Sequence, residues 1–133
     1  MKGQTTCQCG CGLDLQQSMK WVLSSIEREM KKKFGDRYEL ELTCGARCEQ
    51  HNKEKGGALN SAHLLGLAGD VGLITSQERN EFMKITYTVV PIKRREDRLL
   101  NHSYVHIDIA TGSVPHPTPE LSEYPQDVFI VLP

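Results

Sequence analysis

The chain has 133 residues and a mass of 15.0 kDa, which is enough for one domain. Its 16 Lys and Arg against 17 Asp and Glu leave a net charge of −1, which argues against a protein that chiefly grips nucleic acid phosphates. A hydrophobic content of 38% is too high for a disordered chain, and no apolar run approaches the roughly 20 residues that span a bilayer. We therefore expect one globular domain over residues 1–133, a monomer with neither a nucleic acid partner nor a membrane span.

The first residues contain no apolar stretch before the first cysteine, so the sequence predicts no signal peptide and synthesis in a reducing cytoplasm. Five cysteines follow in two clusters, one at Cys7, Cys9 and Cys11 and the other at Cys44 and Cys48. An odd number excludes complete internal pairing. A structural zinc site drawing on both clusters is one alternative, although the alternating spacing differs from the usual CxxC. The simpler interpretation is that these small, partly buried residues pack the N-terminal segment onto the body.

Apolar residues recur at three- and four-residue steps from Leu13 to Phe34, which predicts an amphipathic helix that ends at Gly35. Trp21 within it is interpreted as a core or pocket-wall residue. Alternation over residues 38–42 predicts a strand. The segment 44–69 is rich in Gly, Asn, Ser and His, which favours a functional loop with a short helix around residues 47–53.

The second half of the sequence predicts further short helices, strands and turns. Residues 68–74 are strand-like, residues 76–82 predict a short helix, residues 86–92 a strand and residues 93–98 a charged turn. Alternation over residues 104–109 is the cleanest strand pattern. Residues 114–125 predict an extended surface excursion because of four prolines, and residues 128–132 a terminal strand. Together these indicate an α+β domain, with an N-terminal amphipathic helix packed on a mostly antiparallel sheet.

Two segments carry residues suited to bind a metal. His63 and Asp70 are seven residues apart with glycines between them. His106 and Asp108 follow on the predicted strand and share one face, because strand side chains alternate. Two histidines and one carboxylate, with a fourth position open to water, are the ligand set of a catalytic zinc.

The motif Ser61-x-His63-x-x-Gly66-x-Ala68-x-Asp70, followed by His106-x-Asp108, resembles the zinc peptidases of the D-alanyl-D-alanine carboxypeptidase group. It is most similar to the small single-domain branch found in phage and bacterial genomes. The segment 43–52 resembles that branch's Ser-Gly-Tyr-Arg-Cys-x-x-His-Asn segment, and Cys9-x-Cys11-Gly12 resembles its N-terminal signature. The resemblance is dense from Cys44 to Asp70, returns at residues 104–108 and is absent from the proline-rich C-terminal stretch.

The resemblance implies roles for particular residues. The zinc ligands would be His63, Asp70 and His106, and the zinc would polarise the scissile carbonyl and activate a water. Arg47 stands where the family has an arginine that meets a substrate carboxylate or carbonyl, a task suited to its guanidinium fork. Ser61 stands where the family has a substrate-binding or site-organising hydroxyl. The implied substrates are peptidoglycan stem peptides, and the protein would reach the wall through a holin, lysis or virion delivery.

The general base is not indicated clearly. Ser103 occupies the position, three residues before the last ligand, where many zinc peptidases of this group have Glu, Asp or His. Asp108 is our preferred catalytic candidate because it shares a face with His106, and it could equally orient a ligand. His102 lies farther along the strand. Cys44 and Ala46 replace the usual serine and tyrosine.

Two hypotheses of different classes follow. The first is a zinc-dependent peptidase that cuts peptidoglycan peptides, as a carboxypeptidase or an endopeptidase. The second is a non-catalytic wall-binding or phage structural module on the same fold, and Ser103 at the position of the base motivates it.

Overall fold

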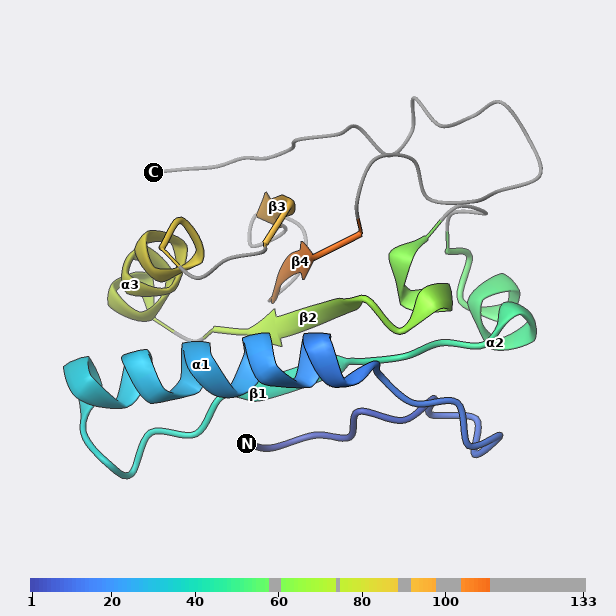
Figure 1. Cartoon of the computed structure of the whole chain (residues 1–133), viewed down its shortest axis with the longest axis horizontal. Helices are drawn as coiled ribbons and strands as arrows, with labels where there is room; N and C mark the ends of the chain where they lie inside the picture. The colour runs from blue at the N-terminus through green and yellow to red at the C-terminus, as the bar shows by residue number, and fades with distance from the viewer. Residues whose placement is uncertain (58–60, 74, 89–91, 98–103, 111–133) are drawn as a thin grey trace.

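The computed structural model describes residues 1–57, 61–73, 75–88, 92–97 and 104–110. Within these ranges, helices pack on a four-stranded antiparallel sheet (Figure 1), which confirms the expected α+β class. The elements are α1 (Gln17–Phe34), β1 (Glu41–Cys44), α2 (Glu49–Glu54), the short 3-10 helix η1 (Ala62–Leu65), β2 (Ala68–Gly72), α3 (Ser76–Thr86), β3 (Arg94–Asp97) and β4 (Tyr104–Asp108).

The sheet has the order β1-β2-β4-β3, with β2 and β4 in the centre. Each adjacent pair is antiparallel. The N-terminal segment adds an isolated parallel bridge between Lys2 and Glu41. The strands predicted at residues 38–42, 68–74 and 104–109 are therefore present, with β1 shifted toward Cys44.

One face of the sheet packs on α1. A stripe of buried residues on α1 joins the inward residues of the strands in one hydrophobic core, namely Met19, Val22, Leu23, Ile26 and Met30 from the helix with Leu42, Val71, Val105 and Ile107 from the sheet. Gly69 of β2 lies on this face, because a Cβ there would contact the side chains of Leu42, Met19 and Leu23. The prediction for Trp21 is wrong: its side chain is 56% exposed, on the side of α1 away from the core.

The helix α1 begins later than the apolar pattern predicts. Gln16 has an extended backbone, and its N–H donates to the carbonyl of Gly66 at 2.9 Å. Gly66 has a left-handed backbone with φ of 70°, and a Cβ there would lie 2.8 Å from the Asp14 carbonyl oxygen. The residues before Gln17 are therefore used to hold the η1 turn against the start of α1 rather than to extend the helix.

Two predictions between residues 86 and 98 are wrong. Thr86 ends α3 instead of starting a strand, and Arg94–Asp97 form strand β3 instead of a turn. Arg95 explains both outcomes: its guanidinium donates to the Thr86 hydroxyl at 2.9 Å and to the Thr86 carbonyl at 2.7 Å, and it stacks 3.9 Å from the ring centroid of Tyr87. This one side chain satisfies the end of the helix and ties the strand to it.

Several predictions fall on residues that lie outside the described ranges. These are Ile74 at the end of the β2 prediction, residues 89–91 of the strand predicted at 86–92, the excursion at 114–125 and the terminal strand at 128–132.

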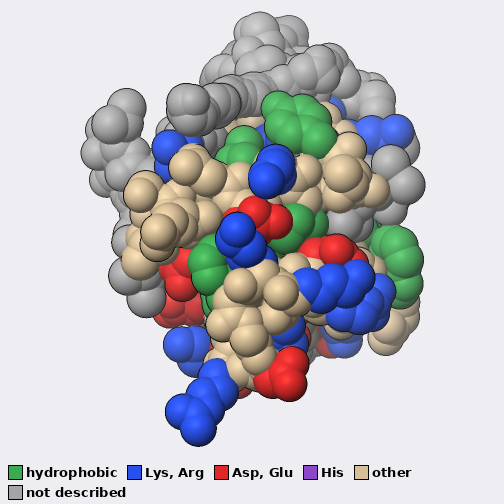
Figure 2. Space-filling model, turned by 90° about the vertical axis from the view of Figure 1, so that its left-hand side faces the viewer, with side chains coloured by type: hydrophobic (Ala, Val, Ile, Leu, Met, Phe, Trp, Pro, Cys, Tyr) green, Lys and Arg blue, Asp and Glu red, His purple; other side chains and the backbone are tan. Residues whose placement is uncertain are grey.

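The surface carries both signs of charge. Figure 2 shows Lys and Arg side chains interspersed with Asp and Glu side chains over the side of the molecule where α3 and the end of α1 lie. Lys31, Lys32 and Lys33 in the last turn of α1 complement the negative end of the helix dipole. Among the described residues, every helix is too short or too polar to cross a membrane.

Candidate metal centre

The second face of the sheet carries the predicted metal ligands. Asp70 of β2 lies directly opposite His106 of β4, and Ala68 lies opposite Asp108. Val71, Val105 and Ile107 alternate with these residues and point to the α1 core. The alternation that fills the core on one face therefore places Asp70, His106 and Asp108 together on the other.

His63 comes to the same place from the turn before β2. The Ser61 hydroxyl caps η1 by accepting the His63 N–H at 3.2 Å, and the left-handed Gly66 ends this turn four residues before Asp70. The Arg47 N–H donates to the His63 carbonyl at 3.0 Å, which joins the turn to the segment after β1. The Ser61 hydroxyl therefore contributes to the site by holding His63 in position.

Both histidines reach the same carboxylate oxygen. His63 Nε2 lies 3.2 Å and His106 Nδ1 lies 2.9 Å from Oδ1 of Asp70. The two rings meet edge-on with their centroids 5.1 Å apart. All three side chains are buried. The structure therefore brings together the three residues that the sequence predicts as ligands.

In each ring, the nitrogen that faces away from Asp70, called the outer nitrogen below, has its own hydrogen-bond acceptor. His63 Nδ1 donates to the Gly45 carbonyl at 2.7 Å, and His106 Nε2 donates to the Asp108 carboxylate at 3.0 Å. Because a carbonyl or carboxylate oxygen can only accept, these bonds place a proton on the outer nitrogen. The inner nitrogens that face Asp70 then carry the lone pair when the rings are neutral.

Opposite charges dominate the electrostatics of this cluster. Burial alone lowers the pKa of His63, but the charge of Asp70 and their hydrogen bond outweigh it and raise the pKa to about 10. Burial likewise acts against His106, whose pKa is raised by its hydrogen bonds to Asp108 and Asp70. For Asp70, burial would raise the pKa, yet the charge of His63 and hydrogen bonds from both histidines hold it well below its usual range.

The donor chemistry of the three residues fits a zinc ion. Two imidazole nitrogens and a carboxylate oxygen converge, and the outer nitrogens have the carbonyl and carboxylate partners that orient histidine ligands of metals. A single carboxylate oxygen of Asp70 lies within hydrogen-bond distance of both rings. His63, Asp70 and His106 would hold the ion.

Cys44 is a further donor at this place that the sequence analysis did not consider. Its sulfur, His63 and Asp70 offer ligand atoms within 4.8 Å of one another. The sulfur lies 3.8 Å from Nδ1 of His63, the nitrogen that donates to Gly45. Burial raises the pKa of the Cys44 thiol, but the hydrogen bond and charge of His63 lower it overall. Cys44 therefore lies behind His63, whereas Asp70 faces the inner nitrogen.

Arg47 lies on the Cys44 side of the cluster. Its guanidinium donates to the Cys44 sulfur at 3.0 Å and to Asn52 Oδ1 at 2.9 Å. Its Nε is buried without a hydrogen-bond partner among the described residues. Gly57 closes over this pair, because a Cβ there would collide with Asn52 and lie 2.8 Å from Nη1 of Arg47. The fork is thus held by Cys44 and Asn52, with its Nε–H lacking a partner among the described residues.

A family described as peptidase M15 matches residues 2–108 of the chain. The chain belongs to the peptidase M15 family. Members of this family are typically zinc-dependent, which agrees with the donor set of His63, Asp70 and His106. No curated protein matches the chain at a significant level of similarity. Membership of this family identifies the chain as a metallopeptidase.

The surroundings of Asp108 bear on its two alternative roles in this M15 peptidase. Its carboxylate is fully buried. One oxygen accepts a hydrogen bond from His106 Nε2 at 3.0 Å, and the other accepts one from Arg94 Nη1 at 2.9 Å. Arg94 lies directly opposite on β3. Both oxygens are thus occupied by cations or donors, an arrangement that favours the orienting alternative over the base.

Glu96 is a further carboxylate beside this cluster, and no sequence motif indicates it. This residue lies directly opposite His106 on β3, so both side chains belong to the same face of the sheet as Asp70. Glu96 is partly buried. Residues 93–98 have the composition of a charged turn, so the sequence does not indicate that the pairing of β3 with β4 brings Glu96 beside the predicted ligands. The other two residues considered near the base, His102 and Ser103, lie outside the described ranges.

Proposed function

We propose that this M15 peptidase hydrolyses peptide bonds in the stem peptides of peptidoglycan, as a D-Ala-D-Ala carboxypeptidase or as an endopeptidase. The observation that carries the proposal is the convergence of His63 Nε2 and His106 Nδ1 on one oxygen of Asp70, each with its outer nitrogen held. The dense resemblance of residues 44–70 to the D-alanyl-D-alanine carboxypeptidase group supports the substrate class.

A zinc ion bound by these residues would supply a Lewis acid for the scissile carbonyl and lower the pKa of its water to about 7. The chain's own residues then have separate tasks. Gly45 and Asp108 fix the ring orientations of His63 and His106. Burial of the ligands excludes bulk water and strengthens each electrostatic contact.

Arg47 is the proposed anchor for the substrate. Its fork is held by Cys44 and Asn52, and its buried Nε has no partner among the described residues. A guanidinium has five N–H donors, so Arg47 keeps donors beyond those used by Cys44 and Asn52 for a substrate carboxylate or carbonyl. Ser61, the proposed site-organising hydroxyl, holds the His63 turn.

Glu96 is the proposed general base. Glu96 is paired with His106 across the sheet, and cross-strand neighbours on one face have Cβ atoms about 5 Å apart, which supports this role. A carboxylate there could accept the proton of the attacking water and return it to the leaving amine. Asp108 is then a positioning residue for His106, held in place by Arg94.

The test is peptide release from purified peptidoglycan, with both termini of the products identified by mass spectrometry. We expect chelator-sensitive release by the wild type, restored by zinc, with loss in His63→Ala. A matched control is His51→Ala, because His51 lies on α2 outside the ligand set. Stoichiometric zinc without release from several wall types would contradict the proposal.

The second candidate is a non-catalytic wall-binding or phage structural module. Ser103 at the usual position of the base favours it. Sedimentation with intact peptidoglycan, measured beside the release assay, separates the two functions. Binding that persists in His63→Ala without any release by the wild type would favour the module.

A further inference from the structure

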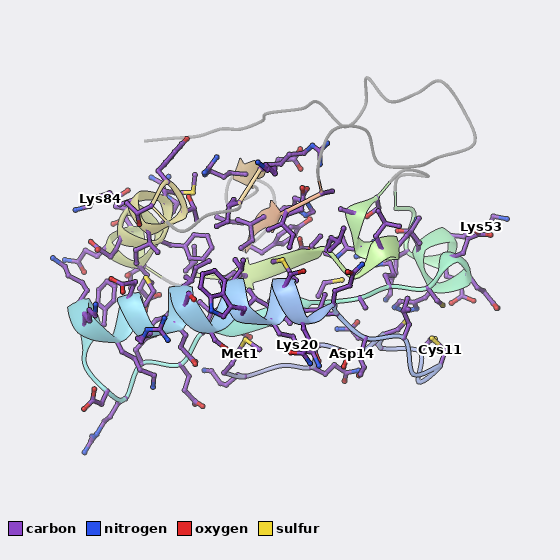
Figure 3. The ribbon with its side chains drawn as sticks, in the orientation of Figure 1. Met1, Cys11, Asp14, Lys20, Lys53 and Lys84 are labelled. Carbon is purple, nitrogen blue, oxygen red and sulfur yellow. The ribbon has the colours of Figure 1, made fainter. Side chains whose placement is uncertain are left out.

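A second group of metal-binding side chains lies away from the His63 centre. The sulfur atoms of Cys7, Cys9, Cys11 and Cys48 all lie within 4.8 Å of one another. The Cys9 sulfur is 3.4 Å from that of Cys7 and 3.6 Å from that of Cys48, 39 residues away in the chain. Figure 3 shows Cys11 in the N-terminal loop at the end of the molecule where α2 lies.

Packing of the N-terminal segment does not account for this cluster. Cys7 is buried, as that interpretation requires, but Cys9 and Cys11 are exposed. Exposed thiols gain little from burying apolar surface, so their convergence on Cys7 and Cys48 needs another cause.

The backbone is folded specifically to bring the alternating cysteines together. In an extended strand at about 3.3 Å per residue, Cys7 and Cys11 would be about 13 Å apart. Instead, the Gly10 N–H donates to the Cys7 carbonyl at 3.1 Å in a turn, and Gly10 has φ of 87° and Gly12 of 94°. These left-handed angles suit glycine, so the residues between the cysteines are those that the turn needs.

Backbone N–H groups also point at the sulfurs. The Cys48 N–H donates to the Cys7 sulfur at 3.3 Å, and the His51 N–H donates to the Cys48 sulfur at 3.4 Å as the cap of α2. Such donors stabilise negative charge on sulfur, as at metal-bound thiolates.

We propose that Cys7, Cys9, Cys11 and Cys48 bind a second, structural zinc ion as four thiolates. Zinc–sulfur bonds of about 2.3 Å in a tetrahedron place the sulfurs about 3.8 Å apart, close to the separations observed. On binding, each thiol releases its proton to solvent and no electron is transferred. A site with four protein ligands is closed, which suits structure rather than catalysis.

The proposed zinc joins two parts of the chain that also serve the first centre. Thr5 accepts the Ala46 N–H at 3.0 Å, and Gly45 leaves room for this approach, because a Cβ there would lie 2.7 Å from the Thr5 carbonyl oxygen. Cys48 directly follows Arg47. The tetrathiolate site would therefore hold in place the segment that carries Arg47 and the Gly45 carbonyl.

Cobalt titration of the reduced full chain tests the site, because cobalt bound by four thiolates has intense visible and charge-transfer bands. We expect one equivalent of such cobalt in the wild type and in His63→Ala, and loss of the bands in the double variant Cys9→Ser with Cys11→Ser, whose side chains are exposed. Cys44→Ser is the matched control, since Cys44 lies outside the four, and should keep the bands. Zinc analysis should give about two ions per wild-type chain and about one in His63→Ala.

X-ray absorption of zinc in His63→Ala adds a measurement that needs no cysteine variant, with about four sulfur ligands at about 2.3 Å expected. Bands that survive in the double variant, a reduced wild type that takes up no thiolate-bound cobalt, or iron rather than zinc in the isolated protein would each overturn the proposal. Failure of the peptidase proposal leaves this result unchanged, because the variant His63→Ala already lacks the first centre.

Discussion

His63, Asp70 and His106 lie inside the molecule, where strand register places Asp70 and His106 and the capped η1 turn places His63. Cys9 and Cys11 instead lie in an exposed loop and are placed by a turn with glycines. The buried cluster has charges that neutralise one another, with each outer nitrogen engaged. The thiol cluster consists of four cysteines, which would bind a metal as thiolates. The difference indicates that charge pairing orders the buried cluster, whereas the exposed cluster relies on its turn and on the zinc proposed above.

The largest expected effect comes from removing a ligand of the buried centre. Asp70→Ala leaves both rings without their shared acceptor and should reduce peptide release by about a thousandfold or more, since the metal provides several kcal/mol of transition-state stabilisation. Zinc content and release rates measure this. Thiolate-bound cobalt should persist in Asp70→Ala, and its loss would show that the two clusters are one cooperative unit.

The variant Glu96→Gln separates catalysis from metal binding. We expect kcat to fall by about 10²- to 10⁴-fold, because the amide cannot accept the proton, while zinc content stays unchanged. Steady-state kinetics and metal analysis on the same preparation check this. An unchanged kcat would exclude Glu96 as the base.

The variant Asp108→Asn tests the orienting role. Loss of the carboxylate that holds His106 Nε2 should weaken zinc affinity by about 10- to 100-fold. Competition with a chelator of known affinity measures it. Excess zinc should restore release by Asp108→Asn, and a rate that stays low at saturating zinc would instead favour Asp108 as the base.

Arg47→Lys asks whether the fork itself matters. A lysine keeps the charge but cannot pair two oxygens, and it loses the contacts with Cys44 and Asn52. We expect kcat/KM to fall by about tenfold or more, mainly through KM, since hydrogen bonds to charged groups contribute about 1.5–3 kcal/mol. An unchanged KM would indicate that another residue anchors the substrate.

The smallest expected effect concerns the exposed cluster. Gly10→Ala meets no atom within 4 Å but forces alanine into φ of 87°, at a cost of about 1–2 kcal/mol. Cobalt affinity of the thiolates should fall by about 5- to 30-fold. Gly35→Ala is the matched control, because it has φ of 101° and equally open space but lies at the end of α1. It should lower thermal stability without changing cobalt affinity.

The proximity of His63, Asp70 and His106 could be predicted from the sequence because it follows from local rules. Strand alternation places His106 and Asp108 on one face, and a capped turn brings His63 back to Asp70. Glu96 could not be predicted this way. The run from Arg94 to Asp97 has the composition of a turn, and it forms a strand because Arg94 pairs with Asp108 and Arg95 with Thr86, both distant in the chain.

The sequence leaves the convergence of the cysteines open. A zinc site shared by two clusters 33 residues or more apart is one alternative beside simple packing, because the alternating spacing differs from the usual CxxC. The positive φ angles of Gly10 and Gly12 decide the outcome, and these angles depend on the docking of the N-terminal segment beside β1. The exposure of the Trp21 side chain likewise depends on which side of α1 the sheet covers.

The pairing of Asp70 with His106 has a consequence for the order of folding events. Asp70 and His63 are seven residues apart and share a turn, but His106 is 36 residues away from Asp70 and arrives only when β4 pairs with β2. A slip of one residue would turn His106 toward α1 and an apolar side chain toward Asp70. Zinc binding by the proposed ligands His63, Asp70 and His106 would therefore begin only after the central strands have found their register. Uptake of that ion by a refolding chain would report the time at which the sheet is correctly formed.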